Sequence, residues 1–135
     1  MAKRWSLETI RVGDEAVVVS TPSWRKDRDG LTPEQDVLNA MKKLTALAAI
    51  RFETALGMNS VKQLKANALF EIRVNGVRFY GARLPMVHIA AGPRSLLVVA
   101  GAEQKSGNVR PDASLLARVE REIEEIRQSW GATGP

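Results

Sequence analysis

The sequence predicts an α+β domain in which a small antiparallel sheet of about four strands is packed by one long helix, with a second helix at the C-terminus. Two observations carry this prediction. Between residues 61 and 111, short runs of β-forming residues are separated by turn-forming pairs, whereas on both sides of this region apolar residues recur at helical spacing. The 135 residues are 44% hydrophobic and 26% charged, enough to bury one core, so we expect a single domain.

The N-terminal part holds two candidate strands, residues 7–12 and 16–20, separated by Gly13 and Asp14. We expect residues 16–20 to be the first strand of the sheet and residues 1–15 to form an N-terminal extension. Residues 22–30, PSWRKDRDG, form either a short helical turn or a charged loop. Trp24 is expected to anchor in the core, although an aromatic ring among Arg25, Lys26 and Arg28 can also stack on a nucleic-acid base.

The long helix is predicted from residue 32 to about residue 56. Thr32, Pro33 and Gln35 match a capping box with proline at the first helical position. Apolar residues then recur at three- and four-residue spacing, which predicts one stripe packed on the sheet. The stripe comprises Val37, Met41, Leu44, Leu47 or Ala48, and Phe52 or Ala55. Gly57 follows as a stop, and the sequence leaves open a hinge in the middle of the helix.

The central region predicts a hairpin. Residues 68–74 and 77–84 read as strands joined by Asn75-Gly76, a pair that suits a tight turn. After Gly92-Pro93, residues 96–99 predict a more fully buried strand. The last helix is expected from Asp112, its cap, to about residue 129, with Leu116, Val119, Ile123, Ile126 and Trp130 along one stripe, and residues 131–135 as a frayed tail.

Positive charge is concentrated in this central region. Residues 61–111 contain eight Lys or Arg and two acids, a net charge of +6 beside +5 for the whole chain. Such a surface either is simply solvated or binds an anionic partner, phosphates above all. The basic residues are Lys62, Lys65, Arg73, Arg78, Arg83, Arg94, Lys105 and Arg110.

The same region resembles the RelE/HigB superfamily of bacterial toxins, especially a phage-derived branch of it, over roughly residues 17–127. The resemblance is carried by Lys62 with Leu64, by the triplet Glu71-Ile72-Arg73, by Gly76-Val77-Arg78 opening the next strand, and by Gln104-Lys105 after the last long strand. It implies a RelE-like fold and a type II toxin, a ribosome-dependent mRNA endonuclease whose partners are the ribosome, mRNA and a neutralising antitoxin.

The resemblance also implies a site. Members that cleave mRNA use the ribose 2′-hydroxyl against the adjacent phosphate, which requires cations at the phosphate and a group that manages protons. By this correspondence Arg78, Arg73 and Lys105 hold the phosphate and Tyr80 handles the proton, with His88 as the other candidate. Further nucleic-acid contacts are expected from Lys62, Lys65, Arg83, Arg94 and Arg110.

Departures from the family pattern support a second interpretation. Leu69 and Glu71 stand where some members carry lysines, and no Tyr or His follows Lys105. Tyr80 and His88 both lie in a strand-like pattern that fits simple packing. The alternative is a non-catalytic phage or prophage protein that inhibits host growth by binding a host macromolecule, nucleic acid or protein, with gyrase as one target because the ParE branch poisons it.

Composition and missing motifs argue against several other classes of protein. The chain has no cysteine and one histidine, so we expect neither disulfides nor a metal site. It has neither a glycine-rich phosphate loop nor a nucleophile elbow, so we expect no cofactor and neither a nucleotide-binding enzyme nor a classical hydrolase. No apolar run reaches the roughly 18 residues of a membrane span, and no signal sequence opens the chain, so we expect a cytoplasmic protein. The oligomeric state is left open.

Overall fold

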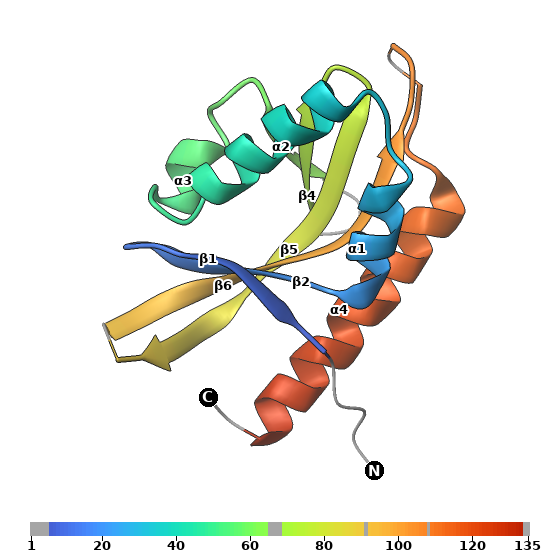
Figure 1. Cartoon of the computed structure of the whole chain (residues 1–135). Helices are drawn as coiled ribbons and strands as arrows, with labels where there is room; N and C mark the ends of the chain where they lie inside the picture. The colour runs from blue at the N-terminus through green and yellow to red at the C-terminus, as the bar shows by residue number, and fades with distance from the viewer. Residues whose placement is uncertain (1–5, 65–68, 91, 108, 134–135) are drawn as a thin grey trace.

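The computed structural model describes residues 6–64, 69–90, 92–107 and 109–133, with the side chains of 85–89 and 130–133 outside the description. The fold is α+β, as the sequence predicts (Figure 1). Its elements in chain order are β1 (Glu8–Val12), β2 (Ala16–Ser20), α1 (Pro22–Asp29), α2 (Glu34–Ala46), α3 (Phe52–Ala55), β3 (Val61–Leu64), β4 (Leu69–Val74), β5 (Val77–Ile89), β6 (Gly92–Gln104) and α4 (Ala113–Thr133).

The sheet has six strands in the order β1-β2-β6-β5-β4-β3, so the prediction of about four strands was too low. The two additional strands are the edges. β1 lies in the expected N-terminal extension and pairs with β2, while β3 pairs with β4. All neighbours are antiparallel except β2 and β6, which run parallel. The sheet is therefore mixed rather than purely antiparallel.

The β5–β6 hairpin is the longest feature of the sheet, with 13 residues in each strand. The predicted turn between β4 and β5 is confirmed, and Asn75 adopts a φ of 53° there. A bulge interrupts the β5–β6 ladder, because Tyr80 pairs with Gly101 and Gly81 with Val99. Ala100 is the extra residue, so the side chains of β6 change faces at this point.

Helices cover both faces of the sheet. One apolar cluster joins α1, α2 and α3 to one face, where the fully buried ring of Trp24 meets Phe79 edge-on at 5.2 Å between ring centroids. This confirms Trp24 as a core residue. The second cluster joins the other face to α4 through Val119, Ile123 and Ile126 (Figure 1).

The helix predicted over residues 32–56 is broken in its middle, where the sequence left a hinge open, since α2 ends at Ala46 and a short α3 begins at Phe52. The carbonyl of Ala48 instead accepts hydrogen bonds from the backbone amides of Glu15 and Ala16. The link between the helices thus leaves the helical path to bond with the β1–β2 turn.

The predicted capping box at the start of this helix was also wrong. Pro33 is the N-cap residue of α2, and no side chain caps the helix there. The Thr32 hydroxyl lies 3.4 Å from the side-chain oxygen of Gln104 instead.

The C-terminal helix follows its prediction more closely. The Asp112 carboxylate accepts a hydrogen bond from the backbone amide of Leu115, which confirms the predicted cap, and Arg118 pairs with Glu122 at 3.4 Å. The expected frayed tail was wrong in part, because α4 continues to Thr133. Nothing is described beyond that residue.

Candidate functional site

The residues predicted to bind phosphate and to transfer a proton meet on the face of the sheet that α4 packs against. Two cross-strand rows of side chains lie there, each contributed by neighbouring strands. In the first row Lys62, Glu71 and Tyr80 stand opposite one another on β3, β4 and β5. In the second row Arg73, Arg78 and Glu103 do so on β4, β5 and β6. Directly opposed residues share a sheet face, so both rows form one polar cluster.

Arg78 is a fully buried member of this polar cluster. Its side chain has no exposed surface, and its Nη2 donates a hydrogen bond to the carbonyl of Gly107 at 3.2 Å. Its Nε and Nη1 are buried and have no hydrogen-bond partner among the described residues. A guanidinium in this setting is expensive to bury, because its hydration is lost and only part of it is replaced.

Tyr80 lies beside Arg78 and is equally buried. Its hydroxyl donates to the Glu103 carboxylate at 2.6 Å. Burial, reinforced by this hydrogen bond, raises the pKa of Tyr80 far above its usual value of about 10. The hydroxyl therefore stays protonated at physiological pH and cannot act there as a general base.

Two further cations, Arg73 and Lys105, lie at the edge of the polar cluster and are paired with acids. The Nε of Arg73 lies 3.2 Å from the Glu71 carboxylate, whose side chain is only 2% exposed. The ammonium of Lys105 lies 3.9 Å from Glu103. Arg73 and Lys105 keep 32% and 28% of their side-chain surface exposed, so these two cations are accessible from solvent whereas Arg78 is not.

The expected nucleic-acid-binding residues are not gathered in one place. Lys62 is exposed on the edge strand β3 and belongs to the first row of the polar cluster. Arg83 and Arg94 line a pocket with α3 and the start of β2, among the side chains of the opposite face. Arg110 is exposed in the segment before α4. Lys65 and the side chain of His88 lie outside the described residues.

Two acids, Glu71 and Glu103, belong to the polar cluster but were absent from the predicted site. Glu71 had a usable signal, since the Asn75-Gly76 turn places it opposite Tyr80 just as it places Arg73 opposite Arg78. Glu103 had none. In the buried strand, Leu96 and Val98 face the polar cluster's side of the sheet, so simple alternation along the strand would place Gln104 there as well. The bulge at Ala100 shifts the alternation by one residue, and Glu103 faces this side instead.

No group of three or more His, Cys, Asp or Glu side chains among the described residues gathers in a way that could hold a metal ion. None of the helices in the described ranges has the length and apolar composition of a membrane span. Comparison of the chain with family models, with curated proteins and with solved structures found no match.

Chemically, the polar cluster and Lys105 at its edge combine four cations, Lys62, Arg73, Arg78 and Lys105, with two carboxylates and one phenol. Arg73 and Lys105 flank the buried guanidinium, an arrangement that suits an anionic group lying across β4, β5 and the end of β6. Glu103 is fixed on one oxygen by Tyr80 and by the backbone amide of Asp112, 3.1 Å away. It is the carboxylate best placed to exchange a proton with a bound group.

Proposed function

We propose that the protein is a toxin of the RelE/HigB type, an endonuclease that cleaves translated mRNA on the ribosome and is neutralised by an antitoxin. One observation supports this most: Arg73 and Arg78 stand directly opposite each other on β4 and β5. Like charges in that relationship destabilise a sheet. A fold retains a destabilising arrangement chiefly where function requires it.

The roles divide according to accessibility. Arg73 and Lys105, partly exposed, contact the phosphate that the 2′-hydroxyl attacks. Arg78 lies behind them and adds positive potential where charge builds up on the phosphate oxygens in the transition state. Glu103 accepts the proton of the hydroxyl, and Tyr80 holds that carboxylate in place. The P–O5′ bond breaks as the 2′-oxygen bonds to phosphorus, and the leaving 5′-oxygen takes up a proton from solvent. The fold, in which two strands precede the helices and an antiparallel hairpin and a C-terminal helix follow them, is compatible with this proposal.

The test is to induce the protein in a bacterial host, follow translation and map new 5′ ends on mRNA. Wild-type protein should produce cuts within translated codons, and Arg73→Gln, Lys105→Gln and Arg78→Ala should lose them. Lys42→Gln is the matched control, because Lys42 is exposed on α2, away from the polar cluster. Circular dichroism establishes that each variant is folded. Cuts that persist in all folded variants would sink the proposed site.

A second candidate is a non-catalytic inhibitor that binds a host macromolecule. It is favoured by the pairing of Arg73 with Glu71 and of Lys105 with Glu103, which neutralises both accessible cations. Growth arrest without mRNA cuts, together with co-purification of gyrase or of ribosomes, would establish it. Absence of growth arrest would argue against both candidates.

A further inference from the structure

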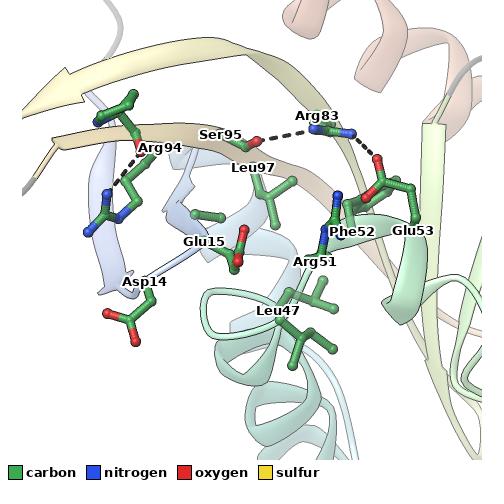
Figure 2. A pocket seen from close by; sticks show the side chains of 13 residues that line it. Asp14, Glu15, Leu47, Arg51, Phe52, Glu53, Arg83, Arg94, Ser95 and Leu97 are labelled. Carbon is green, nitrogen blue, oxygen red and sulfur yellow. Dashed lines mark hydrogen bonds and ion pairs between the residues drawn. The ribbon is translucent and has the colours of Figure 1, made fainter.

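A separate pocket lies on the face of the sheet opposite the polar cluster. It is bounded by the β1–β2 turn, the link between α2 and α3, and the strands β5 and β6 (Figure 2). Its volume of about 250 Å³ falls below the range of roughly 300–1,000 Å³ that is typical of sites for drug-sized ligands. An occupant would therefore be a small molecule.

The floor of this pocket is apolar. Ala16, Leu47 and Leu97 are buried members of the core beneath it, and Ile50 and Phe52 are partly buried at its side. Such a floor favours an apolar group on the ligand, because its contact removes apolar surface from water.

The rim of the pocket is charged and its signs are balanced. It carries three arginines and three acids, brought together from four parts of the chain. In Figure 2 the Glu15 carboxylate lies between Arg94 on one side and Arg51 with Arg83 on the other, while Asp14 points away from them. The rim residues are Asp14, Glu15, Arg51, Glu53, Arg83 and Arg94.

Part of this charge is already used within the protein. Arg83 pairs with Glu53 at 3.1 Å and donates to the Ser95 hydroxyl at 3.3 Å. Arg94 donates to the carbonyl of Gly13 at 2.8 Å. By contrast, the side chains of Arg51 and Glu15 form no hydrogen bond or ion pair with any described residue. The pKa of Glu53 is lowered by a backbone hydrogen bond, by Arg83 and, without a hydrogen bond, by the charge of Arg51. One cation and one anion without a direct partner among the described residues thus face the same small pocket.

We infer that this pocket binds a small zwitterion of the amino-acid type with an apolar side chain. The carboxylate of the ligand pairs with Arg51, its ammonium group with Glu15, and its side chain lies on the floor formed by Leu47 and Leu97. A simple anion such as phosphate gains little here, because the acids of the rim cancel its attraction to the arginines. A purely apolar ligand would leave Arg51 and Glu15 desolvated without a compensating partner. The inference does not depend on the proposed function.

The experiment titrates the full chain, uniformly labelled with ¹⁵N, with L-leucine as the probe and follows the backbone amide signals. Three further probes each lack one feature: isopentylamine lacks the carboxylate, 4-methylpentanoate lacks the ammonium group, and inorganic phosphate lacks the apolar part. L-Leucine should shift the signals of residues 13–16 and 50–53. The amine and the acid should each bind about tenfold more weakly, which corresponds to about 1.4 kcal/mol for the lost charged contact.

Two variants assign the contacts. Arg51→Gln and Glu15→Gln should each weaken L-leucine binding by about tenfold, while Lys42→Gln should leave it unchanged. In Arg51→Gln the preference for L-leucine over isopentylamine should disappear, and in Glu15→Gln the preference over 4-methylpentanoate should disappear. Equal binding of 4-methylpentanoate and L-leucine to the wild type, or tighter binding of phosphate, would overturn the inference. So would the absence of signal shifts with L-leucine, L-valine and L-phenylalanine.

Discussion

Arg73 and Arg78 occupy opposed positions on β4 and β5, and the two guanidinium groups are stabilised very differently. Arg73 is partly exposed and pairs with Glu71, whereas Arg78 is fully buried and two of its nitrogens have no hydrogen-bond partner in the part of the chain that the structure describes. The first arginine therefore compensates a buried carboxylate. The second carries a desolvation cost that the fold does not fully offset.

Replacing Arg78 should consequently stabilise the protein. Methionine has a similar length, follows the apolar stem of arginine and needs no hydrogen bonds, so Arg78→Met should raise the free energy of unfolding by roughly 1 kcal/mol. The measurement is urea unfolding followed by the fluorescence of the tryptophans, of which Trp24 is fully buried. A clear loss of stability would mean that the guanidinium is better satisfied than its contacts indicate.

Arg73→Met should change stability in the opposite direction. It removes the ion-pair partner of Glu71, whose side chain is 2% exposed and whose other oxygen, Oε2, is buried without a partner. Leaving such a carboxylate uncompensated costs several kcal/mol when the pair is fully buried, and the partial exposure of Arg73 reduces this to roughly 1–2 kcal/mol. The same urea experiment measures it. Equal effects of Arg73→Met and Arg78→Met would contradict the distinction between the two arginines.

Tyr80 should remain un-ionised in the folded protein well above pH 10. It is the only tyrosine of the chain, so the ultraviolet difference spectrum of phenolate reports on it alone. Burial raises the pKa of Tyr80 in the folded state above its unfolded value of about 10. Below pH 10 both states are protonated and the contribution to stability is complete; as the pH rises further, the unfolded state ionises and stability is lost.

The phenolate signal should therefore appear only together with the loss of the folded circular dichroism spectrum. Tyr80→Phe should lose about 1 kcal/mol at neutral pH, from the hydrogen bond to Glu103, and part of the alkaline decline should vanish. Phenolate formation near pH 10 in a folded protein would show that the hydroxyl is accessible to solvent.

The sequence predicted local structure well where a local signal determines it. The Asn75-Gly76 turn, the Asp112 cap and the burial of Trp24 each follow from the preference of one or two residues, and each is confirmed. The predicted helix over residues 32–56 failed because Leu47 and Ala48 keep the apolar spacing of a helix. That spacing carries no sign that the Ala48 carbonyl bonds to the backbone at Glu15.

The candidate site was predictable only as far as one hairpin extends. Arg73 and Arg78 are related by the turn between them, so their opposition can be read from the sequence. Glu103 reaches the same face through a bulge in β6, and neither the alternation of side chains nor a turn-forming residue predicts this bulge. The edge strand β3 was missed and β1 was assigned to an extension outside the sheet. Each is only four or five residues long and gives a weak pattern in the sequence.

The contact between Gly13 and Ala48 should be sensitive to a single methyl group. A Cβ at position 13 would lie 2.2 Å from the Ala48 carbonyl oxygen, which is backbone and cannot rotate away. Gly13→Ala should therefore push the link between α2 and α3 away from β2 and cost about 2 kcal/mol. Gly30→Ala is the control, since its nearest atom would be 3.7 Å away, and it should change stability by less than about 0.5 kcal/mol. Urea unfolding of both variants distinguishes a steric effect at Gly13 from a general effect of replacing glycine.

An added methyl group at Gly101 should likewise disturb the packing of α4 on the sheet. A Cβ there would lie 2.5 Å from the Cγ2 of Val119, which is fully buried in α4. Gly101→Ala should cost about 2 kcal/mol through overpacking, and Val119→Ala about 2 kcal/mol through the space it leaves. In the double variant the new methyl group at position 101 occupies that space. The combined loss should thus be smaller than the sum of the single losses by roughly 1 kcal/mol, as measured by a double-mutant cycle in urea. Losses that add within about 0.3 kcal/mol would show that α4 does not pack on β6 at Gly101 in solution.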